Sequence, residues 1–215
     1  MDEVDGRRAR KAKSREAILE AASRLLSRQG IERTSVAEVT AAAGRTVGGF
    51  YGHWQSKEEL FAEAFRARYR ASRGHFLDRH AAASTAVQRG VGLLRAYLSR
   101  SHRDEGEAAC PVPEVTPEVP RLGPELRAVF VEETDAFGDE LGAKVPGGRA
   151  MALGIVALMY GGLSMARAAK GTPLSDEILK ACREVGAWAL AGREANTSEN
   201  ASENVSKSAS KNARK

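Results

Sequence analysis

Apolar residues along this chain recur at the three- and four-residue spacing of an α-helix. The first clear run places Ile18, Leu19, Ala22 and Leu25 on one helical face, and Gly30 follows as a natural helix stop. The same period continues through most of the chain, and no strand-like alternation interrupts it. We therefore predict an all-α protein. Further helices are expected at about 85–101, 123–141, 148–170 and 174–191, with a loop, or one short irregular turn, in the proline-rich segment 110–120.

Two local signals mark helix starts in the N-terminal third. Ser35 with Glu38, and Ser56 with Glu59, have the spacing of a capping box, in which the serine oxygen accepts from the amide three residues on. The first box predicts a short helix and the second a longer one. A third element lies between these two helices.

Glycines dominate that third element, TVGGFYGHW at 46–54. On a helical wheel, the bulky Phe50, Tyr51 and Trp54 share one face, and the opposite face holds Gly48, Gly49 and Gly52. Each glycine costs a helix about 1 kcal/mol relative to alanine, so a partner must need the backbone close by. A capped helix, a glycine-containing turn and a second helix form the layout of a helix-turn-helix, whose second helix enters the DNA major groove. The alternative is that the glycines are merely tolerated on a solvent face.

Positive charge is concentrated at the N-terminal end. The whole chain has a formal net charge of +5, whereas residues 7–79 hold 16 Lys or Arg against 8 Asp or Glu. This asymmetry predicts a polyanionic partner for one region, either nucleic acid or an anionic membrane surface. The run RRARKAKSR at 7–15 has six basic residues and no acidic one, so it is either an arm that reaches DNA or a solvated charge run.

The rest of the composition argues against secretion, metal binding and a membrane partner. The polar N-terminus lacks the apolar core of a signal peptide, so we expect a cytoplasmic protein. Cys110 and Cys182 lack the spacing of a zinc site, and we expect free thiols with no metal or cofactor. The uncharged stretch 150–166 is short for a membrane span and predicts a helix buried on all sides. The polar residues 193–215 predict a disordered tail.

Residues 17–65 resemble, without a gap, the DNA-binding domain of the TetR family of bacterial transcriptional regulators. The parts that agree in order are the helix ending at Gly30, Thr34-Ser35, Ala43-Gly44, Gly48, Phe50-Tyr51 and Ser56-Lys57-Glu58. The resemblance implies an all-helical homodimer with an N-terminal three-helix helix-turn-helix domain and a variable C-terminal domain for ligand binding and dimerisation. The expected divisions are a basic flexible arm at 1–13, the DNA-binding domain at 14–60, the helical C-terminal domain at 61–192 and the tail at 193–215.

The resemblance also implies which residues of the second helix lie near DNA: Arg45, Thr46, Val47, Gly48, Gly49, Tyr51 and His53. Arg45 can bond a guanine or a phosphate, and Thr46 can bond either. Val47 lies on the packed side of the wheel, but at the helix tip it can also touch a thymine methyl. The family usually has a small apolar residue where Arg45 stands, and this puts the packing of the turn in question.

Phosphate contacts are expected around the same helix. Tyr51 is similar to a family tyrosine that contacts phosphate, and His53 is interpreted in the same way. Lys57 and the amides after Ser56 suit a phosphate at a helix N-terminus. Thr34 and Ser35 can bind phosphate likewise, although capping alone explains Ser35. The implied partner is a double-stranded DNA operator.

The C-terminal half predicts a dimer surface and a ligand pocket. The last two helices carry broad apolar faces that a four-helix bundle between two subunits would cover. An unidentified small-molecule effector is expected among the middle helices, near Tyr97, Phe130, Phe137 and Tyr160. Each of these four aromatic residues is also suited to an ordinary core. Cys110, in the proline-rich loop, is a further candidate for this site.

Two functions of different class follow. The first is a dimeric repressor, not an enzyme, that leaves a palindromic operator when an effector binds. A variant of it senses redox state or electrophiles through Cys110, near His102 and Arg103. The second is a thiol enzyme with Cys110 as nucleophile and His102 as base, for which no orienting third group can be identified.

Overall fold

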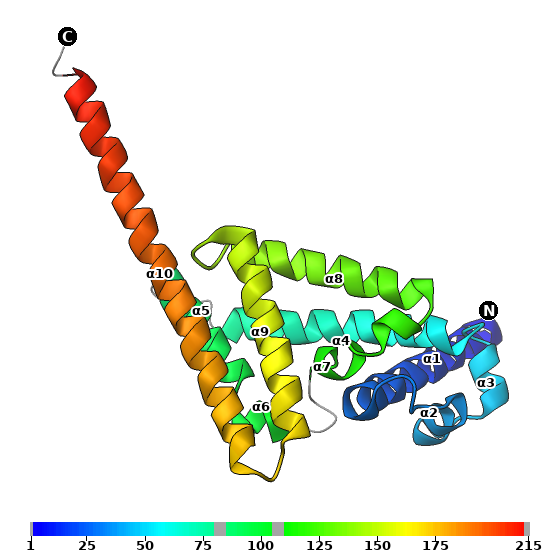
Figure 1. Ribbon diagram of the computed structural model, residues 1–215. Coiled ribbons are helices and arrows are strands. Elements are labelled where there is room, and N and C mark those ends of the chain that lie inside the picture. Colours follow the sequence, from blue (N-terminus) through cyan, green and yellow to red (C-terminus); the bar gives the residue numbers. More distant parts are fainter. Residues whose placement is uncertain (1, 80–84, 105–109, 213–215) are drawn as a thin grey trace. The chain divides into compact units, whose positions relative to one another are not determined.

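The computed structural model describes residues 2–79, 85–104 and 110–212, with side chains between residues 5 and 193. Within these ranges every regular element is a helix, which confirms the predicted all-α fold (Figure 1). In chain order the elements are α1 (Asp2–Gln29), α2 (Val36–Ala42), α3 (Val47–Tyr51), α4 (Lys57–Arg79), α5 (Ala86–Tyr97), α6 (Arg100–Asp104), α7 (Val112–Val115), η1 (Val119–Arg121), α8 (Pro124–Gly142), α9 (Gly148–Ala168) and α10 (Pro173–Asn212).

The chain divides into two compact units. The first combines residues 1–75 with 101–136 and contains α1 to α3 and most of α4. Its core is built from the apolar faces that the sequence predicts, and includes Ile18 and Leu26 of α1 and Phe61 and Phe65 of α4, all fully buried. The predicted boundary between residues 60 and 61 falls near the start of α4, so one continuous helix crosses it.

The second unit combines residues 76–100 with 137–215. Here α9 packs against α10 and α5, and α9 and α10 lie side by side in yellow and orange (Figure 1). Leu94, Ile155, Met159 and Leu190 are buried in this contact. Gly186 lets α10 approach α5 closely, because a β-carbon on Gly186 would lie 2.6 Å from Cδ1 of Leu94 on α5.

The structure corrects the predictions for both ends of the chain. Helix α1 begins at Asp2, inside the predicted flexible arm, and α10 continues to Asn212, through most of the predicted disordered tail. The arm starts with acidic residues, which favour a helix N-terminus, and continues with Ala, Arg and Lys, which are good helix formers. After Gly192 the tail holds neither glycine nor proline, so no strong helix breaker stops α10.

Two internal predictions are also revised. The segment 110–121 is not one loop, because it forms α7 and η1, with prolines in their first turns. Helix α9 is not buried on all sides. Ile155, Met159 and Leu163 face the core, whereas Gly161 and Met165 are exposed. Among the described helices, α9 alone is long and apolar enough to cross a membrane, and a core helix passes the same test.

Candidate nucleic-acid interface

Helix α3 has only five residues, and its neighbours hold it in place. The Thr46 hydroxyl caps it by accepting a hydrogen bond from the Gly49 amide at 3.2 Å. Phe50 and Trp54 anchor it to the core, with exposed fractions of 0% and 1%, and their rings stack with centroids 5.9 Å apart. Because an isolated helix of this length is unstable in water, packing rather than helix propensity determines the conformation of α3.

A polar cluster fixes the chain just after α3. Trp54 Nε1 donates to Glu63 Oε2 at 2.9 Å, and Arg15 Nη2 donates to the same oxygen at 2.5 Å. The guanidinium of Arg15 also lies 4.9 Å from the centre of a Trp54 ring. One carboxylate therefore joins α1, α4 and the end of α3. Sequence reasoning missed this cluster. Arg15 entered the prediction only as the last residue of the basic run 7–15.

The other face of α3 is open to solvent. Arg45, Thr46 and Gly48 are exposed, as are Val47 and Tyr51, at 43% and 64%. A β-carbon on Gly48 would meet nothing within 4 Å. Packing inside the protein therefore does not explain the glycine at this position.

The structure corrects the helical wheel for Tyr51. The wheel predicts Tyr51 on the packed face with Phe50 and Trp54, but Tyr51 is the last residue of α3 and is 64% exposed. The Tyr51 ring contacts Phe50 edge-on, with 5.0 Å between centroids, and still faces solvent. Val47 is also partly exposed, as the resemblance implies and the wheel does not.

The turn before α3 leaves Arg45 free of the core. Gly44, at φ +62°, adopts the left-handed conformation that ends α2, and the Arg45 amide donates to the Thr40 carbonyl at 2.8 Å. The Arg45 side chain is exposed, and among the described residues it bonds the carbonyl of its neighbour, Gly44 O, at 3.1 Å. The polar residue at this position therefore disturbs no apolar contact.

Thr34 does not lie at the interface, which corrects its prediction as a phosphate ligand. It is 1% exposed, and its hydroxyl donates to the Gly30 carbonyl at 2.7 Å, inside the turn between α1 and α2. Ser35 is exposed and caps α2 as predicted, accepting from the Glu38 amide at 3.1 Å. The Thr34 hydroxyl, which the sequence predicts as a phosphate ligand, therefore forms a hydrogen bond inside the protein instead.

His53 and Lys57 lie at the end of the α3 region. Burial, together with the positive charges of Lys11 and Arg15, lowers the pKa of His53. Lys57 Nζ lies 5.8 Å from the centre of the Phe61 ring, at the first position of α4. The nearby Glu59 amide donates to Ser56 Oγ at 3.0 Å, as the capping box predicts, so this amide is not available to a phosphate.

The predicted ligand residues fall in both units. In the second unit, the buried rings of Tyr97 and Tyr160 contact each other, with centroids 5.7 Å apart, and Phe137 is also buried. In the first unit, Phe130 stacks on Phe65 at 6.3 Å. A groove of about 610 Å³ in that unit is lined by other residues: Leu122, Pro124, Arg127, Ala128, Val131 and Glu132.

Cys110 is 3% exposed, which corrects the expectation of an accessible loop thiol. A sensing or catalytic thiol needs access to its reactant, and His102 is also buried at 3%. The acidic residues before Cys110, at 105–109, lie outside the described residues. Among the described residues, no three His, Cys, Asp or Glu side chains are grouped to hold a metal ion.

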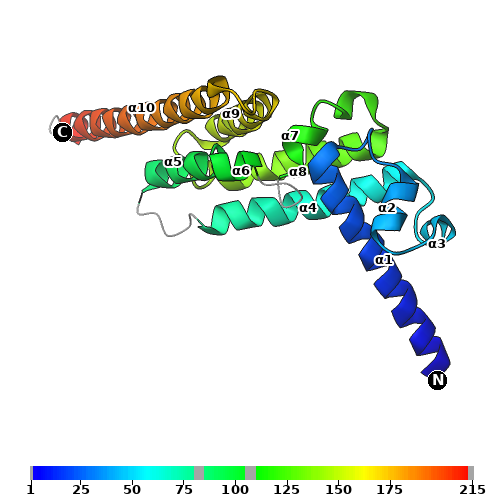
Figure 2. The same cartoon turned by 90° about the horizontal axis from the view of Figure 1, so that it is seen from below.

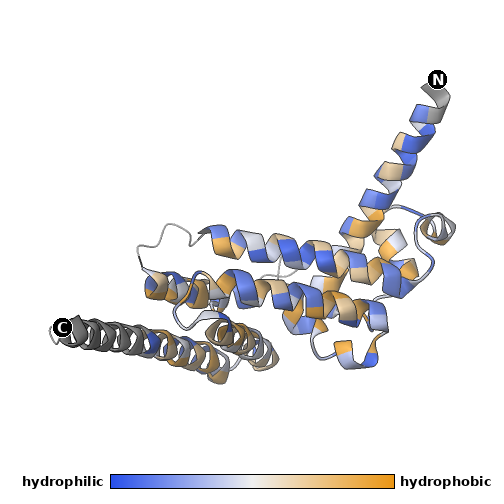
Figure 3. Ribbon diagram, turned by 90° about the horizontal axis from the view of Figure 1, so that it is seen from above, coloured by the Kyte–Doolittle hydropathy of each residue, from blue (hydrophilic) through white to orange (hydrophobic). Residues whose placement is uncertain are grey.

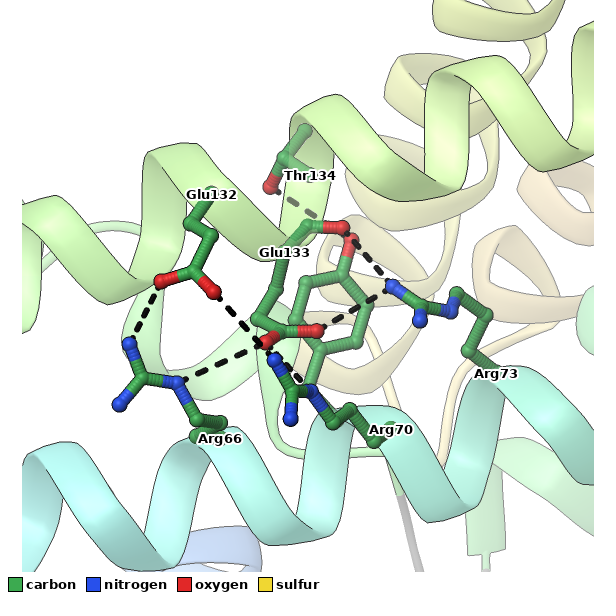
Figure 4. A network of polar contacts seen from close by, with 7 residues as sticks. Arg66, Arg70, Arg73, Glu132, Glu133 and Thr134 are labelled. Atoms are coloured by element: carbon green, nitrogen blue, oxygen red, sulfur yellow. Dashed lines mark hydrogen bonds and ion pairs between the residues drawn. The ribbon is translucent and has the colours of Figure 1, made fainter.

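A charged network joins α4 and α8 within the first unit (Figure 4). Glu133 is 1% exposed and accepts from Arg70 Nε at 2.7 Å and Arg73 Nη1 at 3.2 Å. Its exposed neighbour Glu132 pairs with Arg66 at 2.6 Å. The three arginines lie at i, i+4 and i+7 on α4, so they share the face toward α8. The buried carboxylate is therefore paired with guanidinium groups on both of its oxygens.

Comparison with known proteins places this geometry in a family. Residues 18–64 match the model for bacterial regulatory proteins of the tetR family. The HTH-type transcriptional regulator AcrR of Shigella flexneri is 46% identical over 50 residues, which are 23% of each chain. The chain thus spans less than a quarter of that relative.

Solved structures extend the likeness in fold. A TetR transcriptional regulator from Chloroflexus aurantiacus J-10-FL superposes with a TM-score of 0.69 and 23% identity, over 83% of this chain and 94% of that one. A TetR-family transcriptional regulator from Cytophaga hutchinsonii gives 0.67 and 22%, over 83% and 95%. The helix-turn-helix geometry, the matched residues 18–64 and the all-helical fold agree, and together they make this chain similar to the TetR family of bacterial regulatory proteins.

Proposed function

We propose that this protein is a homodimeric transcriptional repressor of the cytoplasm that binds a palindromic DNA operator and is released by a small molecule. The observation that carries the proposal is the open face of α3. Its polar and glycine residues have no packing role, while Phe50 and Trp54 hold the same helix rigidly. A helix that is packed on one face and exposed on the other suits insertion into a major groove.

Each exposed residue has a proposed role. Arg45 and Thr46 bond base edges or phosphates, and Val47 meets a thymine methyl. Gly48 and Gly49 allow the α3 backbone to approach the groove. The remaining proposed contacts are to phosphates, from Ser35, Tyr51, His53 and Lys57.

A dimer through α9 and α10 is supported by the apolar side chains that these helices leave exposed. Trp188 is 76% exposed and Val185 55%, and both lie on α10. Met165 on α9 is 61% exposed, beside the small residues of its open face. Both helices thus leave large apolar side chains exposed along their length, and a second copy would bury them.

The effector is proposed to bind in the C-terminal region, 61–192, where Tyr97, Phe137 and Tyr160 provide an aromatic cluster. It releases DNA by stabilising a conformation in which the two α3 helices no longer match successive major grooves. The proposed DNA-binding domain, 14–60, is joined to this region by the continuous helix α4.

The decisive experiment is a genome-wide pull-down with the purified protein, followed by competition with a small-molecule library. We expect enrichment of short palindromes with half-sites about one helical turn apart, and release of DNA by at least one compound that also raises the melting temperature. Enrichment of DNA without any shared sequence would refute the repressor proposal.

A further inference from the structure

Four basic side chains lie on one face of α1. With 100° between successive residues, Arg7, Arg8, Lys11 and Arg15 fall within an arc of about 100°. We call these four residues the basic stripe. Lys13 points to the opposite side of the helix, and Arg10 lies outside the stripe, about 60° beyond Arg7.

The outer part of the basic stripe is available to a partner. Arg7, Arg8 and Lys11 are exposed, and within the described part of the chain none of them forms an ion pair. No acidic residue lies between residues 6 and 15. Within residues 6–15 the helix therefore carries no carboxylate to neutralise these charges.

The inner end of the basic stripe lies beside the end of α3. Arg15 stands over Trp54 at 4.9 Å, and the His53 ring lies 5.4 Å from the Trp54 ring. Lys11 lies one turn before Arg15 on the same face, and its charge acts on His53. The basic stripe thus continues the positive surface that begins at the proposed DNA interface.

The helix carries this surface outward. Residues 5–13 are all exposed, whereas α1 is packed from Ile18 onward, and the outer half projects beyond α2 and α3 (Figure 2). At about 1.5 Å of rise per residue, the distance from Arg15 to Arg7 is about 12 Å, or roughly the axial length of three to four base pairs.

We propose that the basic stripe binds phosphates of duplex DNA next to the base pairs that α3 contacts, so that each subunit covers a longer site than its helix-turn-helix alone. This proposal rests on the proposed function for the position of the DNA. It assigns the contact to one face of a rigid helix rather than to the whole basic run.

The composition of this segment favours DNA over a membrane surface. A helix that lies on a membrane buries a face of large apolar residues. Between residues 5 and 16 nothing apolar is larger than alanine, and the projecting half of α1 is largely hydrophilic (Figure 3). This segment can therefore attract a partner only through its charge, which suits the phosphate backbone of DNA.

Two double variants of the full chain test the proposal. Arg8→Ala with Lys11→Ala removes two charges from the basic stripe, and Arg10→Ala with Lys13→Ala removes two charges that lie outside it. Alanine is a good helix former, so circular dichroism and melting temperature should stay unchanged in both. Affinity is measured against salt concentration on a random-sequence duplex and on a selected operator with long or trimmed flanks.

In the variant that lacks Arg8 and Lys11, the slope of log affinity against log salt concentration should fall in magnitude by about 1.8, because each lost phosphate contact removes roughly 0.9. This stripe variant should also bind the long operator about tenfold more weakly at low salt. The control variant should keep the wild-type slope. Trimming the flanks of the operator should lower the affinity of the wild-type protein by about the same tenfold factor. The affinity of the stripe variant should not change.

Equal losses in the two variants would overturn the proposal, because they would indicate diffuse attraction rather than an oriented contact. Stripe-dependent binding to phosphatidylserine vesicles with unchanged DNA slopes would assign the surface to membranes and overturn it too. Failure to select any operator would refute the repressor proposal alone, since the random-sequence duplex still tests the basic stripe.

Discussion

The Glu118 carboxylate occupies the space where a side chain on Gly30 would begin. A β-carbon built on Gly30 would lie 2.9 Å from Glu118 Cδ, and Glu118 Oε2 accepts from the Ile31 amide at 2.7 Å. Gly30 also has φ +76°, which a β-carbon disfavours. The turn after α1 is therefore closed by a residue from the other end of the first unit.

Gly30→Ala should destabilise the protein by about 2–4 kcal/mol, from backbone strain and displacement of the carboxylate. Gly44→Ala is the matched control, because Gly44 also has a positive φ, +62°, but no atom within 4 Å of its β-position. It should lose only about 1–2 kcal/mol. Urea denaturation measures both, and equal losses would show that Glu118 moves aside freely.

Replacing Gly48 and Gly49 together with alanine should have two opposite effects. Helix propensity should raise stability by up to about 1 kcal/mol per site, because neither β-carbon meets a close contact. Operator affinity should fall, since two methyl groups hold α3 away from the bases. Calorimetry and binding titrations measure these effects, with Gly74→Ala on α4 as the control that gains stability and keeps its affinity. Unchanged operator affinity in the double variant would mean that this face looks only at water.

Trp188→Glu should convert the proposed dimer to a monomer, because a charge placed on the exposed face of α10 would have to be buried at the interface. Val131→Glu is the control, as it places a charge at a 59% exposed position on α8. Sedimentation equilibrium distinguishes the two. A dimeric Trp188→Glu protein would rule out this face as the interface.

Removing the buried carboxylate of Glu133 should be far more harmful than removing its neighbour. Glu133→Ala removes the buried carboxylate that Arg70 and Arg73 share, although Arg70 keeps its ion pair with Glu132, and should cost about 3–5 kcal/mol. Glu132→Ala breaks exposed pairs and should cost no more than about 1 kcal/mol. Chemical denaturation of the two variants gives the comparison, and similar losses would contradict the role of burial.

Protonation of His53 should link DNA binding to pH. Its pKa in the free protein is below the usual 6.5, so the unfolded chain gains a proton first and stability from this group falls as pH drops through 6.5. A DNA phosphate beside His53 would raise the pKa of this residue again. Operator affinity should therefore increase as the pH falls through the same range, by at most about tenfold per pH unit. His53→Gln should remove this dependence and His75→Gln should keep it. Identical pH profiles for wild type and His53→Gln would exclude a phosphate contact at His53.

The parts of the interface that sequence could predict are local ones. The cap at Ser35 depends on residues three positions apart, and the structure has it as predicted. The exposure of Tyr51 depends on where a five-residue helix ends, which neighbouring helices decide. The bond from Ile31 to Glu118 joins residues 87 positions apart, and no periodic pattern encodes such a pair. Long-range polar contacts and helix ends therefore had to come from the structure.

The anchoring of α3 through Phe50 and Trp54 also affects how such a regulator evolves. The residues that hold the helix and the residues that would meet DNA are different side chains on opposite faces. Changes at Arg45, Val47 or Tyr51 leave the core intact, so a lineage can acquire a new target sequence without first losing its fold. A library randomised at these three positions should yield mostly folded proteins with diverging DNA preferences.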